Sequence, residues 1–344
     1  MRRKTLPVEN PNQFFAYKPF DASRIAILLT QNPMCKELYE NFIHYRIEKI
    51  NSQGYMQLDC HFNEEFSSIG VKKMPIDLLL DLSIGFIEFC KKSIDRNFYL
   101  FIPIECSKIS NYSVYKKEKL PHHIFVYGYD DEQQVFLCSE FFYFSKKGYS
   151  FEVVSYLEME EAFLDLQNQT TPEMMNKEQF QWLKDIQLLK SFADYKDKFT
   201  IQRVQSGLRF YLDGRDCYGN KGYLKDVYYG IAIYNLLEEY INEILKENYE
   251  LFDIRCFTLI FFHFRYLRLQ AEFIKQNYDI EKQDVFIKKF LDLEKCANIL
   301  LNVAIKYQIT RKKAILQNII KKIKEMKEGD INILTQYINY LEHL

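Results

Sequence analysis

The segment from residue 122 to residue 144 constrains the fold more than any other part of the chain. Its two apolar runs, 124–129 and 135–144, are rich in β-branched and aromatic residues, and a polar turn sequence separates them. This pattern predicts an antiparallel hairpin. The runs 98–104 and 149–154 have a similar composition and predict two further strands. We therefore expect an antiparallel sheet in the first half of the chain.

Helical periodicity dominates the rest of the sequence. Apolar residues recur at steps of three and four over 33–50 and over 75–93, which predicts a helix in each segment. Beyond about residue 166 nearly every segment has this period. The helices expected there are 224–247, 255–277, 281–306, 310–328 and 330–343.

The length of 344 residues is enough for two domains of ordinary size. The sequence becomes polar near residue 168, where a domain boundary is expected. The predicted fold class is therefore α+β, with an antiparallel sheet in a domain at 1–168 and an all-helical domain at 169–344.

Charge and cysteine content exclude several classes of protein. The 46 basic and 47 acidic residues leave no excess of positive charge for a nucleic acid. The basic start is not followed by the apolar stretch of a signal peptide, and no apolar run is long enough to cross a bilayer. The eight cysteines are scattered without a CxxC pair. We expect a cytoplasmic protein with reduced thiols that binds neither nucleic acid nor membrane.

Common cofactor and metal motifs are missing from the sequence. It contains no GxxxxGK[ST] or GxGxxG phosphate loop and no GxSxG nucleophile elbow. The glycine-rich stretch 214–222 lies between predicted helices, so we interpret it as a structural loop rather than an anion site. His61, Glu64 and Glu65 lack the spacing of metal ligands and are interpreted as a solvated turn. We expect no bound cofactor and no metal.

His122 is the strongest candidate for a catalytic residue. It begins a predicted strand and is followed six and seven positions later by Gly128 and Tyr129, as in papain-like and C39-like cysteine enzymes. Glu140 ends the partner strand, where it could orient the imidazole, and His123 is a candidate supporting residue. The alternative is that two histidines simply begin an exposed strand.

Cys35 is the candidate nucleophile. It lies in the first turn of the helix predicted at 33–50, where the helix dipole lowers the pKa of a thiol. Gln31, four residues earlier, could donate a hydrogen bond to an oxyanion. Cys60, beside His61, is a weaker second candidate. The alternative for Cys35 is an ordinary thiol near a helix end.

The chain resembles the family of butirosin biosynthesis protein H, whose N-terminal domain is papain-like. The resemblance covers nearly the full chain through short motifs at 55–59, 98–105, 111–115, 122–130, 156–163, 229–234 and 253–255. It implies acyl or aminoacyl transfer from a carrier-protein thioester to an amine in natural-product, nonribosomal-type antibiotic biosynthesis, as in the related closthioamide synthetase. An acyl or peptidyl carrier protein would then present the substrate on its phosphopantetheine arm, and the second substrate would be a small amine.

Two other functions stay open. A cysteine peptidase or amidase would use the same residues, with water in place of the amine. A non-catalytic scaffold would bind the carrier protein without turnover. Residues 311–327 hold seven basic residues and one acid on a predicted helix. We interpret them as a solvated face, with docking of an acidic carrier as the alternative. The sequence leaves the oligomeric state open, a homodimer included.

Overall fold

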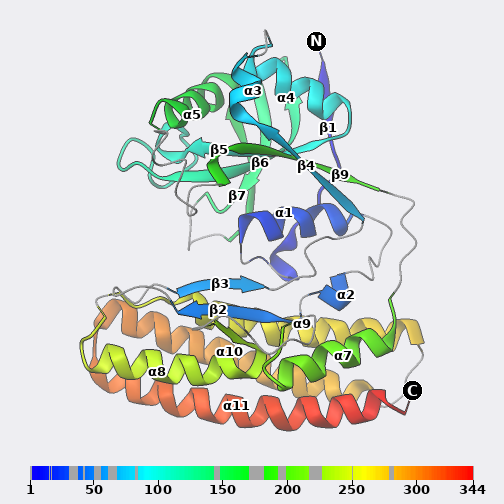
Figure 1. Ribbon diagram of the computed structural model, residues 1–344, viewed down its shortest axis with the longest axis vertical. Coiled ribbons are helices and arrows are strands. Elements are labelled where there is room, and N and C mark those ends of the chain that lie inside the picture. The colour runs from blue at the N-terminus through cyan, green and yellow to red at the C-terminus, as the bar shows by residue number, and fades with distance from the viewer. Residues whose placement is uncertain are drawn as a thin grey trace. The chain divides into compact units, whose positions relative to one another are not determined.

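The structure is a computed structural model of the chain, and it forms two compact units (Figure 1). Unit 1 comprises 1–33 and 66–195, and unit 2 comprises 34–65 and 196–344. The residues that the structure describes are 2–14, 16, 18–30, 38–41, 43–49, 56–60, 68–81, 84–142, 148–169, 182–192, 199–216, 227–249, 251–278 and 283–343. The units differ from the two predicted domains because 34–65 groups with the C-terminal helices; the division after residue 168 stays a prediction.

Unit 1 is built on one antiparallel sheet. Its strands lie in the order β4 (Ile69–Pro75), β9 (Asp185–Ser191), β5 (Tyr99–Glu105), β6 (Pro121–Asp130), β7 (Val135–Glu140) and β8 (Ser150–Ser155), and β1 (Arg3–Thr5) pairs with the end of β6. The predicted hairpin and its two neighbouring strands are confirmed. The expectation of helices alone beyond residue 166 is wrong for β9. This strand pairs with β4 on one side and β5 on the other, so sheet pairing rather than periodicity decides its structure.

Helices cover both faces of this sheet, and β5 is accordingly buried along its whole length. Helices α4 (Phe86–Asp95) and α5 (Tyr156–Gln169) pack on one face, where Phe86 stacks on Phe163 with ring centroids 4.1 Å apart. Helix α1 (Pro19–Leu28) packs on the other face through Phe20, 5.0 Å from the ring of Phe101 (Figure 1). The helix predicted at 75–93 is wrong as one element. The structure has β4 up to Pro75, then α3 (Ile76–Asp81) and α4, which begins after Gly85.

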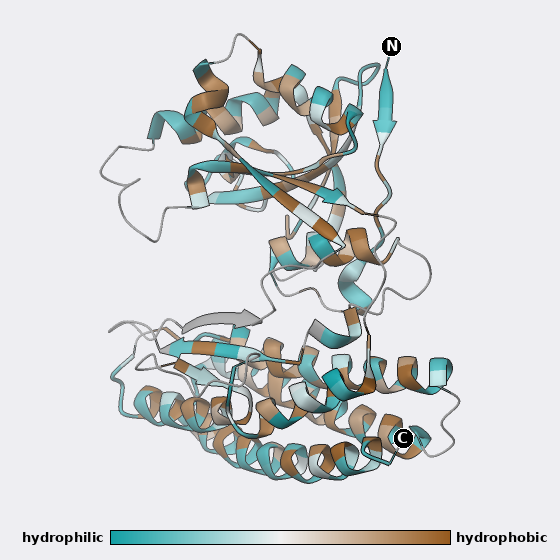
Figure 2. Ribbon diagram, turned by 45° about the vertical axis from the view of Figure 1, so that its right-hand side comes forward, coloured by the Kyte–Doolittle hydropathy of each residue, from teal (hydrophilic) through white to brown (hydrophobic). Residues whose placement is uncertain are grey.

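Unit 2 is mainly helical. It contains α2 (Leu38–Asn41), α7 (Ile201–Leu212), α8 (Ile233–Leu245), α9 (Arg255–Tyr278), α10 (Gln283–Thr310) and α11 (Lys313–Leu341), with a small sheet in the order β10 (Val227–Tyr229), β2 (Tyr45–Lys49) and β3 (Met56–Cys60). Short 3-10 turns occur in both units, at Pro11–Gln13, Cys106–Lys108 and Gly230–Ala232. The long helices carry apolar and polar residues in alternating bands (Figure 2), as helices with one buried face do.

Several helix predictions in unit 2 differ from the structure. Residues 45–49 form β2 rather than the end of a helix, because Tyr45 and Ile47 alternate with Arg46 and Glu48 and the strand pairs on both sides. The predicted helices 310–328 and 330–343 form the single helix α11, which continues through Gly329. The helix predicted at 224–247 begins later, because 227–229 forms β10. The helices expected at 255–277 and 281–306 are confirmed as α9 and α10.

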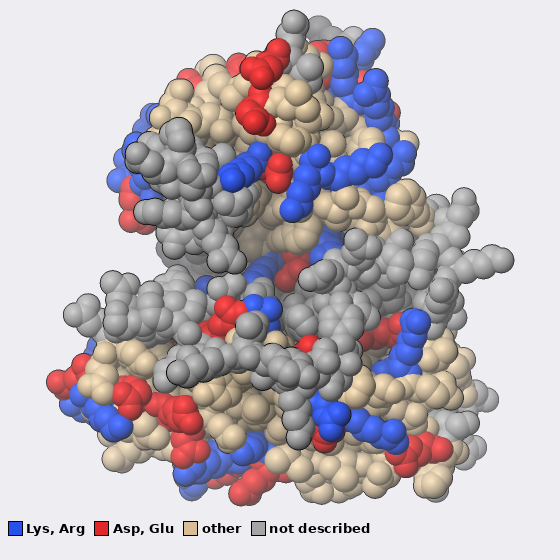
Figure 3. Space-filling view, in the orientation of Figure 1, with Lys and Arg blue, Asp and Glu red and all other residues tan. Residues whose placement is uncertain are grey.

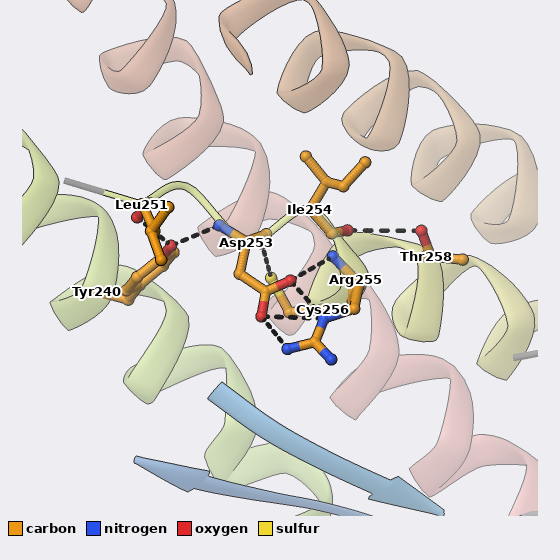
Figure 4. Close-up of polar contacts among 7 residues, drawn as sticks. All are labelled: Tyr240, Leu251, Asp253, Ile254, Arg255, Cys256 and Thr258. Atoms are coloured by element: carbon orange, nitrogen blue, oxygen red, sulfur yellow. Dashed lines mark hydrogen bonds and ion pairs between the residues drawn. The ribbon is translucent and has the colours of Figure 1, made fainter. Parts of the chain in front are cut away.

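The start of α9 is held by a compact polar cluster (Figure 4). The carboxylate of Asp253 accepts hydrogen bonds from the backbone N–H of Arg255 at 3.0 Å and from its guanidinium. The Asp253 N–H donates to the hydroxyl of Tyr240, which donates in turn to the carbonyl of Leu251. Because the first N–H groups of a helix lack partners within the helix, these contacts stabilise its beginning. Part of the motif 253–255 therefore has a structural role.

None of the described helices is both long and apolar enough to cross a membrane. On the face seen in Figure 3, basic and acidic side chains lie among one another. This mixture agrees with the balanced composition of the chain.

Candidate active site

Strand register brings His122 and Glu140 to the same face of the unit 1 sheet. Phe125 of β6 pairs with Ser139 of β7, so Ile124 lies opposite Glu140. Side chains two residues apart on a strand share a face, and His122 is therefore a diagonal neighbour of Glu140. The Nδ1 atom of His122 lies 3.8 Å from Oε2 of Glu140. The structure thus brings together two of the residues predicted from the sequence.

Glu140 is a buried acid with incomplete hydrogen bonding. Its side chain is 1% exposed, and Oε1 accepts the N–H of Phe141 at 2.7 Å. Oε2 has no hydrogen-bond partner among the described residues. Burial raises the pKa of the Glu140 carboxyl well above its usual value, because a charged carboxylate is poorly solvated there. An unpartnered oxygen on such a group faces the imidazole of His122.

The His122 imidazole is partly open to solvent, with 32% of its side chain exposed. Its Nδ1 lies 3.1 Å from the backbone carbonyl of His123. A carbonyl can only accept, so Nδ1 carries the proton and Nε2 is left as a base. Burial lowers the pKa of His122 below its usual value. The neutral form needed by a general base is therefore favoured near pH 7.

His123 lies on the opposite face of the sheet from His122. Its ring stacks on Phe101, 4.3 Å between centroids, and contacts Trp182 at 4.6 Å. Phe101 in turn contacts Phe20 of α1, so His123 belongs to the side of the sheet that α1 covers. Burial, with His122 as a smaller cause, lowers the pKa of His123 to about 3. The structure does not bring this predicted supporting residue to the His122–Glu140 pair.

The buried surroundings of Glu140 contain residues that the sequence did not indicate. Burial, with the negative charge of Glu140 as the next cause, raises the pKa of the Cys106 thiol, which hydrogen-bonds with Tyr112. Glu105 accepts the N–H groups of Ser107 and Leu120 and so fixes the connection between β5 and β6. In the sequence, the only indication of these residues is that Glu105 and Cys106 lie next to each other at the end of a predicted strand. A buried thiol with a raised pKa is a poor nucleophile.

The predicted nucleophile falls outside what the structure describes. This applies to Cys35, to Gln31 and to the turn at His61, Glu64 and Glu65, whereas Cys60 is placed in β3 by its backbone alone. Among the described cysteines, burial raises the pKa of Cys90, Cys106, Cys138 and Cys256, and Cys296 is exposed on α10. None of the four buried thiols is an activated partner for His122.

Helix α1 does not supply a thiol either. It begins with Pro19 and Phe20, and its one buried hydroxyl near this end, Ser23, donates to the carbonyl of Pro19 at 2.7 Å and contacts the Tyr149 hydroxyl. No group of three or more His, Cys, Asp or Glu side chains in the described part of the chain is arranged to hold a metal ion. The chemistry of the described site is therefore that of an acid–imidazole pair.

Replacing Glu140 with Gln should stabilise unit 1 more at pH 8 than at pH 5. The folded-state pKa of Glu140 is raised, so its stabilising contribution is present below its usual pKa of 4.5 and is lost as the pH rises. Each unit of pKa difference corresponds to about 1.4 kcal/mol. Urea unfolding at the two pH values measures the effect, with Glu132→Gln in the exposed turn after β6 as the matched control. An equal change at both pH values would contradict the prediction.

A comparison with models of known protein families gives no match, and a comparison with curated protein sequences gives none either.

Proposed function

We propose that this chain is a cysteine-dependent acyltransferase that forms an amide bond from a carrier-protein thioester. The observation that carries the proposal is the partly exposed imidazole of His122 beside the buried carboxyl of Glu140. Such a pair activates a thiol in acyl-transfer enzymes. A papain-like arrangement of unit 1 is part of the proposal, supported by its antiparallel sheet and by the short motifs that include 122–130. A cytoplasmic location also belongs to it, because the thiol has to stay reduced.

The proposed reaction has two half-reactions. In the first, the Cys35 sulfur attacks the thioester carbonyl while Nε2 of His122 takes the thiol proton. The carrier thiol then leaves with that proton, and the acyl group stays on Cys35. In the second, an amine attacks the acyl-enzyme, His122 takes a proton from the amine nitrogen, and the amide is released as the proton returns to Cys35. Gln31 is the proposed donor to the oxyanion.

Glu140 is proposed to assist when His122 becomes positively charged. The imidazolium that forms in each half-reaction lies beside the unpartnered Oε2 of Glu140. An oxygen lone pair of Glu140 beside the imidazolium stabilises the positive charge that forms on His122. The reaction needs no cofactor beyond the arm of the carrier.

A second candidate is a carrier-protein-binding scaffold without turnover. The observation that favours it is that four of the described cysteines are buried with raised pKa values, and that α1 begins without a thiol. A cysteine peptidase or amidase is the third candidate and differs only in that water resolves the acyl-enzyme.

The experiment that separates these candidates follows the acyl group. A carrier protein loaded with a radiolabelled acyl thioester is incubated with the chain and a panel of small amines, and amide and free acid are quantified. We expect amide to exceed acid in the wild type and both products to vanish in Cys35→Ala. Free acid as the main product would favour the hydrolase, and carrier binding without either product would favour the scaffold.

A further inference from the structure

A hollow lined by lysines lies at the edge of the sheet from which β6 begins. It has a volume of about 320 Å³ and is lined by residues 115–119, with Ser107, Lys108 and Glu161. This volume falls within the range of small-molecule sites. Residues 106–120 connect β5 to β6. Along the sequence, only Leu120 and Pro121 lie between Lys119 of the hollow and His122. The hollow and the candidate imidazole therefore belong to the same end of β6.

The lining is more basic than the chain as a whole. Four lysines and two glutamates give the hollow a formal charge of +2, whereas the whole chain carries −1. Two of the ammonium groups already have partners, since Lys108 lies 3.8 Å from Asp165 and Lys117 donates to the carbonyl of Ser113 at 2.8 Å. Among the described residues, Lys116 and Lys119 form no ion pair. These two lysines are therefore available to an anion.

The backbone at Lys116 is in a conformation that non-glycine residues rarely adopt. Its φ angle is +54°, and its N–H donates to the carbonyl of Ser107 at 3.0 Å. Left-handed backbone at such a residue is unfavourable and persists where surrounding contacts enforce it, often at binding sites. The Lys116 ammonium lies 4.8 Å from the ring centroid of Tyr115, beside the hollow. The Lys116 ammonium also donates a hydrogen bond to the hydroxyl of Tyr115, and the negative charge of the more distant Glu161 acts on it.

We propose that this hollow binds the phosphate of the phosphopantetheine arm on the carrier protein. The inference rests on the proposed function, because it assumes that the substrate arrives on such an arm. Lysine ammonium groups with nearby Ser107 and Tyr115 hydroxyls are suitable donors to phosphate oxygens, and the volume leaves room for part of the arm. The phosphate and the thioester lie at opposite ends of the arm. A phosphate site beside the start of β6 would hold the arm at the end of the strand that carries His122.

Direct binding measurements test this proposal without requiring turnover. Isothermal calorimetry compares 4′-phosphopantetheine, pantetheine without the phosphate, and inorganic phosphate. We expect phosphopantetheine to bind about tenfold more tightly than pantetheine, the effect of one charge-assisted hydrogen bond to phosphate, and more tightly than inorganic phosphate. The double variant Lys116→Gln/Lys119→Gln should remove this preference, and salt should weaken it in the wild type.

A matched control is available on α11. Lys321 pairs with Glu325 at 3.8 Å and Lys324 pairs with Glu238 at 2.8 Å, so the double variant Lys321→Gln/Lys324→Gln removes equal charge from another surface. It should leave phosphopantetheine binding unchanged. The proposal would be overturned if the wild type bound pantetheine as tightly as phosphopantetheine, or inorganic phosphate as tightly as phosphopantetheine. It would also be overturned if the control variant lost as much affinity for phosphopantetheine as the Lys116→Gln/Lys119→Gln variant.

A further assay distinguishes failure of the acyltransferase proposal from failure of the phosphate site. A short acyl thioester of N-acetylcysteamine lacks the phosphate, so its conversion by the wild type tests the acyl-transfer chemistry without the hollow. If the wild type does not convert it, the acyltransferase proposal fails while the binding result stands. If the wild type converts it but shows no preference for phosphopantetheine, the phosphate site alone is wrong.

Discussion

Replacing His122 with Ala should lower the rate of amide formation from a carrier-bound thioester by about 10²- to 10⁴-fold, the usual contribution of a general acid–base group. The imidazole takes a proton in both half-reactions, so acylation and resolution should both slow. Because the pKa of His122 is lowered, the loss of kcat/KM towards acid pH should have its midpoint below the ordinary histidine pKa of about 6.5. Stopped assays across about pH 5 to 9 measure both effects.

The adjacent histidine provides the control for this result. His123 lies on the other face of the sheet, stacked on Phe101 and against Trp182. Replacing His123 with Phe retains an aromatic ring in that stack and should leave the transfer rate nearly unchanged. If His123→Phe is as inactive as His122→Ala, the assignment of the base to His122 is wrong.

Replacing Asp330 with Leu should lower the free energy of unfolding of unit 2 by about 3 kcal/mol or more, as removal of one partner from a buried polar cluster does. Asp330 is fully buried on α11, and one carboxylate oxygen accepts the hydroxyl of Tyr211 at 2.9 Å and that of Tyr234 at 3.3 Å. His263 lies 3.9 Å away and is itself buried. Leu would leave both hydroxyls without this acceptor.

Urea unfolding of the full chain, followed by the circular dichroism of the helices, measures this change. The control is Asp292→Asn on α10, where an exposed acid pairs with Lys295 at 3.3 Å. We expect a change within about 0.5 kcal/mol there, as for other exposed ion pairs. A loss of similar size in both variants would contradict a special role for the Asp330 cluster.

The elements predicted correctly are those whose structure follows from a local pattern. The hairpin of β6 and β7 has two apolar runs and a polar turn, and α9 and α10 are long helices with regular apolar spacing. The strand at 45–49 was mistaken for helix because Ile43, Ile47 and Ile50 also fit a helical period. Its alternation becomes decisive only when β3 and β10 pair with it. Strand β9 likewise depends on partners that are distant in the sequence.

The site also has a part that follows from local sequence and a part that depends on distant segments. His122 and Glu140 could be paired from the sequence because they lie in one hairpin, whose register is local. The lysine hollow combines the β5–β6 connection with Glu161 of α5, and the Asp330 cluster combines three other helices with α11. No spacing in the sequence encodes such combinations, because tertiary packing alone brings their members together.

Intact-protein mass spectrometry after mixing the chain with an acyl-loaded carrier shows whether Cys35 carries the acyl group during transfer. In the absence of amine, the wild type should gain the mass of one acyl group, and peptide mapping should locate it on Cys35. Addition of an amine should remove that mass and release the amide faster than water releases the acid. Amide formation without any adduct, or full activity in Cys35→Ala, would contradict the covalent mechanism.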